Sequence, residues 1–303
     1  MSNVVLVDFS QTVIAACAAN AKDIRDGDTK SFIKHIVFNM LLSWKKKFIL
    51  TPSDKLILAC DAKSYWRKDE FPAYKGHRKH AKKDNSFLDW DLMKEVLKEL
   101  KEDITLNFPY ILLEVEGAEA DDIIAILIMY LEENELVQTG LIEESKHAII
   151  ISTDGDFQQL QRYPNVSQWN NTEKKFLKCL NPSRYLSEHI ASGDTGDNVP
   201  NICTPDSWAQ ARADNIPTRA VSFSKARFDD FYELGINACK NEEEKRNWKR
   251  NEMLVDLSKI PSGINTLVIK EYLDYTIVGN KAKVFNFLVK NKMKLLLPYS
   301  ADF

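Results

Sequence analysis

The stretch IIISTDGDF, residues 149–157, joins a run of isoleucines to two carboxylates that are separated by a single glycine. Consecutive β-branched residues favour a strand that is buried on both faces, as in a parallel sheet. Asp154, Gly155 and Asp156 follow where that strand must end, because Asp and Gly are turn-forming residues. The stretch therefore predicts a buried strand that holds two negative charges at its carboxyl end.

Similar apolar runs occur at VVLVDF (4–9), LILAC (56–60) and YILLEV (110–115), and with AIIIS (148–152) they predict four buried strands. Helical patterns lie between them, near 31–47, 88–103 and 119–135. Strands that alternate with helices indicate an α/β fold with a central, mainly parallel sheet flanked by helices. Ligands of such sheets bind beyond the carboxyl ends of the strands. Acidic residues follow all four predicted strands at that edge: Asp8, Asp61, the group Glu119, Asp121 and Asp122, and the pair Asp154 and Asp156.

The composition is that of a globular protein: 44% of the 303 residues are hydrophobic and 28% are charged, with a net charge of −3. Five widely spaced cysteines without a CxxC motif favour reduced thiols over disulfides or zinc. The small residues near 12–21 do not form a signal peptide, because no basic residue precedes Lys22 and Asp8 interrupts the apolar run. The longest apolar segment, 123–131, is too short to span a bilayer. We therefore expect a cytoplasmic protein without a membrane partner.

The strand signal fades beyond about residue 185, and charged helical material such as EEEKRNWKRNEML (242–254) follows. This change predicts two domains: an α/β domain over 1–185, which carries the acidic edge, and a smaller helical domain over 186–303. We expect the apolar tail LLLPYSADF (295–303) to pack on the helical domain. The alternative is a free tail that docks on a partner protein.

Each acidic residue alone has a simpler explanation, as a favourable charge at a helix N-terminus or as part of a turn. Together they do not, since two unit charges about 4 Å apart repel by roughly 1 kcal/mol in water and about 4 kcal/mol at an intermediate dielectric. Oxygen-only ligands select hard cations such as magnesium or manganese. GDTGDN (193–198) adds a second acidic pair, Asp194 and Asp197, and two acidic clusters predict two metal ions. The chain has no EF-hand, P-loop or GxSxG motif, and we expect its five histidines to be surface or packing residues.

Residues 63–83, KSYWRKDEFPAYKGHRKHAKK, carry a local net charge of +6 in a chain whose total charge is negative. Aromatic residues lie between the cations, a composition typical of surfaces that bind single-stranded nucleic acid. A solvated surface loop is the alternative. Because the stretch follows Asp61 directly, we expect it to overhang the acidic edge of the sheet as a mobile, positive segment.

The motifs containing Asp8 and Asp61, EADD (119–122), DGD (154–156) and GDTGDN, together with YKGHRK (74–79), resemble the flap endonuclease/5′-nuclease family. The resemblance covers residues 4 to about 200 and implies a PIN-like nuclease core with a basic helical arch at about 63–90. It assigns the first metal to Asp8, Asp61, Glu119 and Asp121. It places Asp122, Asp154, Asp156, Asp194 and Asp197 around the second, some acting through water. Asp154, Asp156 and an arch lysine, Lys75, are the expected catalytic residues, and the expected nucleic-acid contacts are Arg67, Tyr74, Lys75, Arg78 and Lys79, with Tyr74 stacking on a terminal base.

The chain departs from the family pattern after GDTGDN. The family has a glycine-rich hairpin there that binds duplex phosphate and a monovalent cation, whereas no glycine occurs here between Gly196 and Gly235. A degenerate helix-hairpin-helix-like element is therefore expected, and Arg212, Arg219, Lys225 and Arg227 are alternative duplex contacts.

The resemblance implies a monomeric, Mg²⁺-dependent 5′-to-3′ nuclease with two metal ions, for which Mn²⁺ can substitute. Its expected substrates are RNA–DNA hybrids and duplex or flapped DNA, and its expected role is to remove RNA primers from lagging-strand fragments. A single-strand DNA-binding protein and a sliding clamp are the expected replication partners. Two alternatives stay open: an acidic-rim, PIN-type ribonuclease, and a non-catalytic binder of branched nucleic acid.

Overall fold

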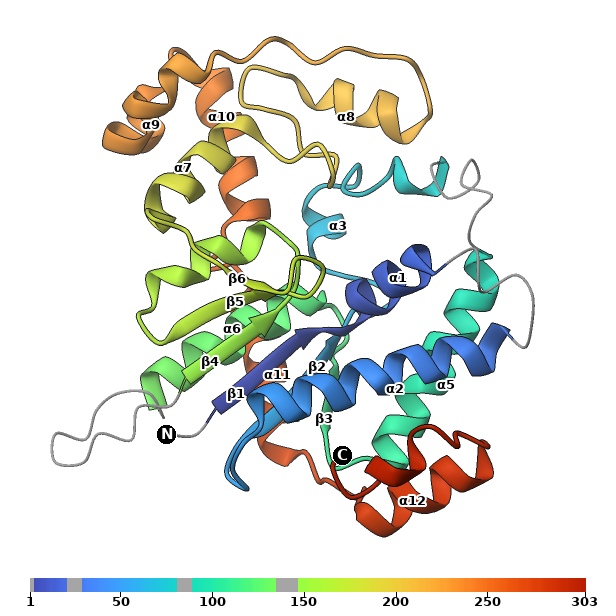
Figure 1. The fold of residues 1–303 in the computed structure, drawn as a ribbon. Helices are drawn as coiled ribbons and strands as arrows, with labels where there is room; N and C mark the ends of the chain where they lie inside the picture. Colours follow the sequence, from blue (N-terminus) through green and yellow to red (C-terminus); the bar gives the residue numbers. More distant parts are fainter. Residues whose placement is uncertain (1–2, 21–28, 81–88, 135–146) are drawn as a thin grey trace, which may run out of the picture.

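The computed structural model describes residues 3–20, 29–80, 89–134 and 147–303. Its centre is a six-stranded sheet in the order β3-β2-β1-β4-β5-β6 (Figure 1). The first five strands in the chain pair in parallel, and β6 is antiparallel to β5. The strands are β1 (Asn3–Asp8), β2 (Lys55–Cys60), β3 (Ile111–Glu114), β4 (His147–Ile151), β5 (Val166–Asn170) and β6 (Lys175–Leu177). The four predicted strands and the mainly parallel α/β sheet are confirmed, whereas β5 and β6 were not predicted.

Alternate residues of each central strand enter two different hydrophobic cores, since successive side chains point to opposite faces of a sheet. In β1, Val5 and Val7 belong to one core and Val4 and Leu6 to the other. Both faces are therefore covered, which explains why the strand sequences are continuously apolar rather than alternating.

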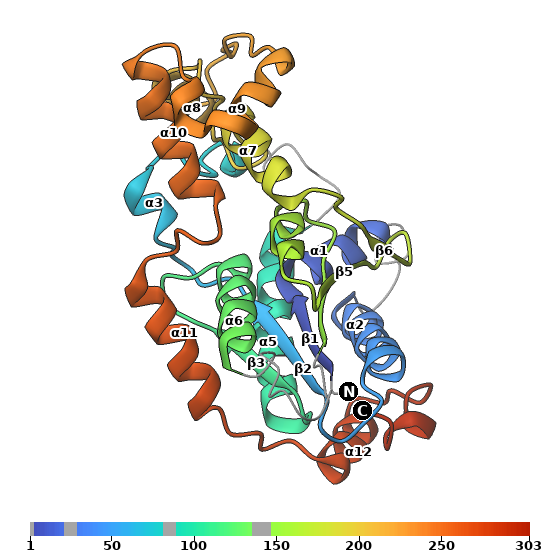
Figure 2. The ribbon, with the colours of Figure 1, turned by 90° about the vertical axis from the view of Figure 1, so that its left-hand side faces the viewer.

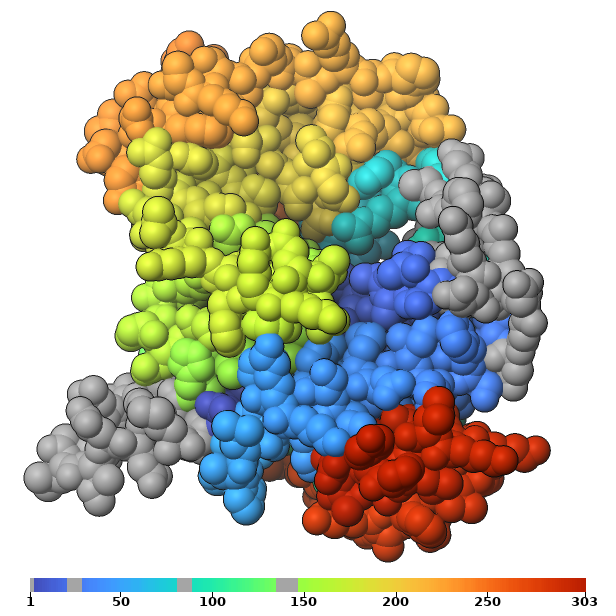
Figure 3. Space-filling view, in the orientation of Figure 1, coloured from blue at the N-terminus to red at the C-terminus, as the bar shows by residue number. Residues whose placement is uncertain are grey.

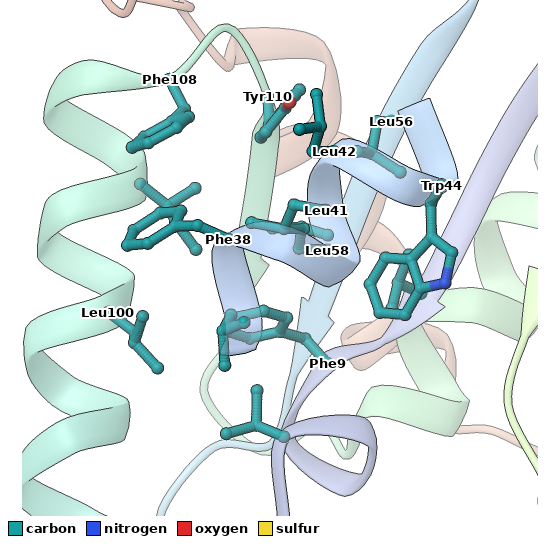
Figure 4. Packing of buried hydrophobic residues seen from close by; sticks show 14 of the residues in the cluster. Phe9, Phe38, Leu41, Leu42, Trp44, Leu56, Leu58, Leu100, Phe108 and Tyr110 are labelled. Atoms are coloured by element: carbon teal, nitrogen blue, oxygen red, sulfur yellow. The ribbon is translucent and has the colours of Figure 1, made fainter. Parts of the chain in front are cut away.

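Helices cover both faces of the sheet, as the two views show (Figures 1 and 2). One face carries α1 (Phe9–Ala19), α2 (Thr29–Phe48) and α5 (Trp90–Asn107), and the other carries α6 (Ala120–Asn134) and α11 (Ser262–Asp274). The core of the first face is rich in aromatic rings; Phe38 of α2 stacks on Phe108 with ring centroids 4.7 Å apart (Figure 4). The predicted helices near 31–47, 88–103 and 119–135 correspond to α2, α5 and α6.

Residues 182–255 form a helical region above the carboxyl ends of the strands. It contains α7 (Pro182–Ser192), α8 (Asp206–Ala213), α9 (Phe228–Leu234) and α10 (Glu242–Val255), with short 3₁₀ turns at Lys225–Arg227 and Gly235–Ala238. Asn181 and Asn241 cap α7 and α10, each accepting a hydrogen bond from a backbone N–H of the first turn. A separate small core holds this region together: Ile190, Ala191, Ile202, Phe231, Trp248 and Val255.

The remaining residues return to the sheet, so the prediction of one helical domain over 186–303 does not describe the packing. Helix α11 contacts α6 and β3, and α12 (Lys281–Lys290) contacts α5. Val284, Phe287 and Leu288 of α12 lie in the same core as Phe38. The amphipathic pattern of α12 predicts a buried face but does not say which surface will cover it.

The C-terminal residues lie beside α2 at the end of the molecule opposite α8 (Figure 3). Phe303 is buried with its ring centroid 5.3 Å from that of Phe108, and Asp302 forms a 2.9 Å ion pair with Lys46. A 3₁₀ turn at Leu297–Tyr299 precedes them. The expectation that this tail packs on the helical domain is therefore wrong, because it packs on the helices of the α/β core. Within the described residues, no helix combines the length and the apolar character that crossing a membrane requires.

Candidate functional site

A cleft of about 420 Å³ opens at the carboxyl ends of β1 and β4. The connections of the sheet run in opposite directions from these two neighbouring strands, so the cleft occupies the switch point at which ligands of parallel sheets bind. The structure brings six of the nine predicted metal ligands to this cleft, and its lining residues are Asp8, Gln11, Ile14, Asp61, Lys75, Arg78, Trp90, Ala120, Asp121, Asp154, Asp156 and Asp197.

Two carboxylates are oriented by the starts of helices. Asp8 ends β1 and caps α1, where its Oδ1 accepts a hydrogen bond from the N–H of Gln11 at 3.3 Å. Asp61 follows β2, and its Oδ1 accepts from the N–H of Ala120, the first residue of α6, at 3.0 Å. Backbone N–H groups at the start of a helix have no partner within the helix, so they hold both carboxylates in place at the edge of the sheet.

The Asp154–Asp156 turn is held by groups that the sequence did not single out. Oδ1 of Asp154 accepts from the N–H of Asp156 at 3.0 Å, which closes the turn. The hydroxyl of Ser152 lies 2.9 Å from Oε1 of Gln11 and 3.3 Å from Oδ2 of Asp8, and it accepts from the N–H of Asp154. Ser152 and Gln11 therefore link the acids of β1 to those of β4.

The carboxylates at the centre of the cleft have raised pKa values, because they are buried and because they repel one another. Burial, followed by the charges of Asp61 and Asp154, raises the pKa of Asp8 to about 8. Burial, followed by the charge of Asp156, raises the pKa of Asp154 to about 6. Such shifts mean that a nearby cation would be bound favourably, and carboxylate oxygens are the donors that hard divalent ions prefer. The residues present thus fit a divalent metal.

Glu119 and Asp122 lie beside the cleft in a buried ion-pair network around Arg67. Nη1 of Arg67 lies 2.9 Å from Oε2 of Glu119, Nη2 lies 2.8 Å from Oδ1 of Asp122, and Nε donates to the carbonyl of Leu254 at 2.9 Å. Oδ2 of Asp122 accepts from the indole N–H of Trp66 and from the N–H of Glu119. Ligand atoms of Glu119, Asp121 and Asp122 lie within 4.8 Å of one another, close enough for a shared cation, and Arg67 supplies positive charge there.

The prediction that Arg67 contacts nucleic acid is wrong, because its side chain is only 1% exposed. A guanidinium buried with its three nitrogens engaged cannot reach a phosphate without breaking the network. Asp122 is fully buried as well, and its contacts in this structure are to Arg67 and to the N–H donors. The composition of the basic stretch could not show that Arg67 is buried whereas its neighbours are exposed, because the two acids that pair with it lie more than fifty residues away in the chain.

The base of the predicted arch is docked on the GDTGDN loop, beneath the α8 region (Figure 3). The N–H of Lys75 donates to the carbonyl of Asp197 at 2.8 Å, and its ammonium group lies 3.3 Å from the Asp197 carboxylate and 2.5 Å from that of Glu119. Arg78 also pairs with Asp197, while its side chain stays 48% exposed. Lys75 has a left-handed backbone conformation (φ 54°), which turns its side chain and its N–H toward the same loop.

This docking corrects two expectations. Tyr74 is 1% exposed and its hydroxyl donates to Asp197 Oδ2 at 2.6 Å, so it does not present a ring for a base to stack on. The described part of the basic stretch is packed rather than overhanging: after the short helix α3 (Arg67–Glu70), turns at 72–77 lead to residues 78–80. Lys79 is exposed there, whereas residues 81–88 of the predicted arch lie outside the described residues.

Asp156, His189 and Asp194 form a second group of possible ligands. Nε2 of His189 lies 2.9 Å from Oδ1 of Asp156. Burial opposes protonation of His189, but the hydrogen bond and charge of Asp156 outweigh it and raise its pKa. We expected all histidines to be surface or packing residues; His189 does pack on the ring of Tyr185, and it is in addition a possible ligand. In the sequence, the feature that could have indicated a role for His189 was its position near the end of a helix, four residues before GDTGDN.

The loop after GDTGDN is held by side chains from α10. Asn251 donates to the carbonyls of Ile190 and Pro200, and Asn247 donates to that of Ile202. Gly193 (φ 67°) begins this loop, and a Cβ there would lie 2.5 Å from the carbonyl oxygens of Val199 and Pro200. Helices α7 and α8 flank the loop, and the degenerate helix-hairpin-helix-like element stays a prediction. Of the alternative duplex contacts, Arg227 is instead paired with Glu244 at 2.7 Å.

Comparison with known proteins agrees with this geometry. The family model for the 5′-3′ exonuclease, N-terminal resolvase-like domain, matches residues 3–188. The chain belongs to this family. It is a nuclease, and the predicted resemblance to the flap endonuclease/5′-nuclease family, and within it to the ribonuclease H of T-even bacteriophages, is confirmed.

The individual relatives cover nearly the whole chain. Ribonuclease H of Enterobacteria phage T4 is 29% identical over 291 residues, 94% of this chain and 90% of the relative. The D15 protein of T5, crystallised with metal ions, covers 97% of this chain and 98% of its own with a TM-score of 0.57 at 19% identity. The D15 flap endonuclease of bacteriophage T5, in a complex with DNA and metal ions, covers 96% and 99% with a TM-score of 0.60 at 17% identity. At these identities the two structures establish the fold alone.

Proposed function

We propose that this protein is a magnesium-dependent 5′-to-3′ exonuclease and flap endonuclease that hydrolyses phosphodiester bonds near the 5′ ends of RNA–DNA hybrids and duplex DNA. The observation that carries the proposal is the single cleft in which six carboxylates face the arch cations Lys75 and Arg78. The names of the relatives, a ribonuclease H and a flap endonuclease bound to DNA, support the two substrate classes. Removal of RNA primers from lagging-strand fragments is the role that fits both.

Two metal ions fit the separation of the acids into two groups. Asp8, Asp61, Asp121 and Glu119 would hold the first, while Asp154, Asp156 and Asp194 would hold the second, with Asp122 and Asp197 near them. His189 joins the second group as a nitrogen donor or as a partner of Asp156. When bound, such ions supply Lewis-acid activation of water and stabilisation of the charge that develops on phosphate. Mn²⁺, which accepts the same oxygen ligands, is expected to substitute.

The protein's own groups have separate tasks in this proposal. Lys75 lies between the acids and the open cleft, where its ammonium can pass from Asp197 and Glu119 to a phosphoryl oxygen and stabilise the charge that develops there. Arg78 and Lys79 are exposed on the same side and contact the backbone phosphates. No group has been identified that reads a 2′-hydroxyl, so we expect weak discrimination between RNA and DNA strands.

Cleavage of nicked and flapped duplexes with RNA or DNA 5′ ends, in Mg²⁺ and in EDTA, tests the proposal. The wild type should cut both kinds of end only with metal, and Asp154→Asn should lose cleavage while still binding the flap. Cleavage of RNA but not of a DNA flap would favour an acidic-rim ribonuclease. Binding without cleavage under every metal condition would favour a non-catalytic binder. Turnover by Asp154→Asn with Mg²⁺ alone would overturn the assignment of the site.

Action as a monomer in the cytoplasm of a host cell, alongside a single-strand DNA-binding protein and a sliding clamp, stays a prediction. Because Phe303 is buried in the α/β core, a clamp contact through the C-terminal tail would require that residue to leave its site. Any such partner is therefore expected to dock elsewhere on the surface.

A further inference from the structure

A second cleft, of about 860 Å³, lies at the amino ends of β2 and β3, at the edge of the sheet opposite the acidic residues. It opens between the turn that precedes β2 and the C-terminal residues (Figure 3). Its volume is in the range of small-molecule sites. Four lysines and two aspartates line it in the described part of the chain: Lys45, Lys46, Asp54, Lys55, Lys281 and Asp302. The cleft thus carries an excess of positive charge.

Both acidic residues of this cleft already have partners. Asp54 accepts hydrogen bonds from three backbone N–H groups, at 2.6, 2.6 and 2.7 Å. Asp302 forms its 2.9 Å ion pair with Lys46. Among the other lysines, Lys55 donates to the hydroxyl of Tyr272 at 2.8 Å. The two carboxylates are therefore engaged away from Lys45 and Lys281.

Lys45 and Lys281 face each other across the cleft as like charges. Lys281 is the first residue of α12; it is exposed and forms no ion pair with the described residues. Nζ of Lys45 donates to the main-chain oxygen of Phe303. Burial, and after it the charge of Lys281, lowers the pKa of Lys45, while Asp302 acts in the opposite direction. An anion that contacts both ammonium groups would relieve this repulsion.

A buried hydroxyl borders the same cleft. Tyr110, which precedes β3, is 2% exposed, and its hydroxyl has no hydrogen-bond partner among the described residues. Its ring stacks on that of Phe108 with centroids 5.9 Å apart, and the hydroxyl lies on the side turned away from Phe108 (Figure 4). Nζ of Lys45 lies 6.0 Å from the centroid of the Tyr110 ring. Burial raises the pKa of this phenol, which keeps it a protonated donor. Because a buried donor without a partner is costly, an acceptor atom of a ligand would be favourable here.

The cleft also has an apolar wall, formed by Ile49, Pro109 and Ile277. Ile277 is 47% exposed, so a ligand that covers it removes apolar surface from water. Donors for an anion and an apolar wall in one cleft match a molecule with a phosphate at one end and an uncharged ring at the other.

We propose that this cleft binds a nucleoside phosphate. Lys45, Lys281 and the hydroxyl of Tyr110 contact the phosphate, whose three terminal oxygens can each accept from one of these donors, and the base packs on the apolar wall. The site and the acidic cleft lie at opposite edges of the sheet, so the proposal does not depend on the nuclease function.

Calorimetric titration of the full-length protein with adenosine 5′-monophosphate, in EDTA, tests the proposal. EDTA prevents metal-mediated binding of phosphate in the acidic cleft, where carboxylates without metal repel it. Adenosine 5′-monophosphate should bind more tightly than inorganic phosphate or adenosine, since each of these has only one of the two recognised parts. No binding of the nucleotide, or an affinity no higher than that of phosphate or of adenosine, would overturn the proposal.

Lys281→Met places the binding in this cleft. It should weaken binding of adenosine 5′-monophosphate about tenfold, as expected for loss of a charge-assisted hydrogen bond. Lys290→Met is the matched control, because Lys290 is an exposed lysine at the other end of α12 and does not line the cleft. It should bind as wild type does. Unchanged binding by Lys281→Met, or equal weakening in the two variants, would show that the nucleotide binds elsewhere.

Tyr110→Phe removes only the hydroxyl and separates a binding role from a structural one. Without nucleotide its unfolding temperature should not fall, because no hydrogen bond within the described protein is lost. Its affinity for adenosine 5′-monophosphate should fall about fivefold, because a donor to the phosphate is missing. A lower unfolding temperature would mean that the hydroxyl is bonded within the protein, and an unchanged affinity would mean that it does not contact the ligand; either result contradicts the proposed site.

Discussion

Asp8 and Asp197 line the same cleft, yet their surroundings shift their pKa values in opposite directions. Burial and the neighbouring carboxylates Asp61 and Asp154 raise the pKa of Asp8. Asp197 is also buried, but the charges of Lys75 and Arg78 outweigh burial and lower its pKa. The sheet side of the cleft therefore lacks positive charge, while the arch side neutralises its own carboxylates. A bound cation would therefore be most favourable on the sheet side of the cleft, where the protein supplies no positive charge of its own.

The largest effect should follow from removing a carboxylate on the sheet side. Asp8→Asn should reduce single-turnover cleavage of a flapped duplex by about a thousandfold or more, since metal-assisted charge stabilisation contributes several kcal/mol. The unfolding temperature in EDTA should not fall, because the amide removes a destabilising buried charge. A fall in that temperature together with retained cleavage would mean that Asp8 is a structural residue and that the comparison is wrong.

A substitution on the arch side should lower the stability of the folded protein and not only the rate of cleavage. Arg67→Met leaves Asp122 buried without its cationic partner and leaves Glu119 paired only with Lys75, and loss of one member of a buried ion pair costs about 3–5 kcal/mol. Urea unfolding of the metal-free protein measures this change. Arg246→Met is the control, because that arginine is exposed and its contacts are a long ion pair with Asp206 at 3.7 Å and hydrogen bonds to its neighbour Asn247. Equal stability of the two variants would contradict the structural role assigned to Arg67.

Lys75 connects the two sides and should affect the chemical step. Lys75→Ala should lower the single-turnover rate constant about a hundredfold, as expected for loss of one donor to a developing negative charge. Binding of the flap should weaken much less, because other cations contact the phosphates. Lys290→Ala, an exposed cation at the end of α12, serves as the control. Parallel losses in rate and in binding would reduce Lys75 to a phosphate contact.

The smallest expected effect is the pH dependence of stability without metal. The pKa of Asp8 is about 8 in the folded protein and 3.8 for the free side chain, so the folded state holds this proton more tightly. Its protonated form therefore favours folding at low pH, and this contribution is lost as pH rises from about 4 to 8. In EDTA the unfolding temperature of wild type should fall by several degrees more than that of Asp8→Asn between pH 5 and pH 8. An identical pH dependence of the unfolding temperature in the two proteins would mean that folding does not raise the pKa of Asp8.

The local sequence pattern was sufficient to predict the four central strands. Each is a short, continuously apolar run, and these runs alternate with helical patterns, as is typical of buried strands in a parallel sheet. The pattern was also sufficient to predict that Asp8, Asp61 and Asp154 converge, since the carboxyl ends of parallel strands meet at one edge. It was not sufficient for Arg67, Tyr74 or His189. Each of these depends on a partner more than thirty residues away, and neither composition nor spacing reports such a partner.

The chain's order of strands and acids alone thus determined the class of fold, the edge at which the site lies and the chemistry of its ligands, because these follow from backbone periodicity and the side-chain types. Only the tertiary structure decided which charges are already paired, and that α12 and Phe303 complete the core of the α/β domain. These outcomes depend on which surfaces become buried together, and that choice is made by long-range packing rather than by any local stretch of sequence.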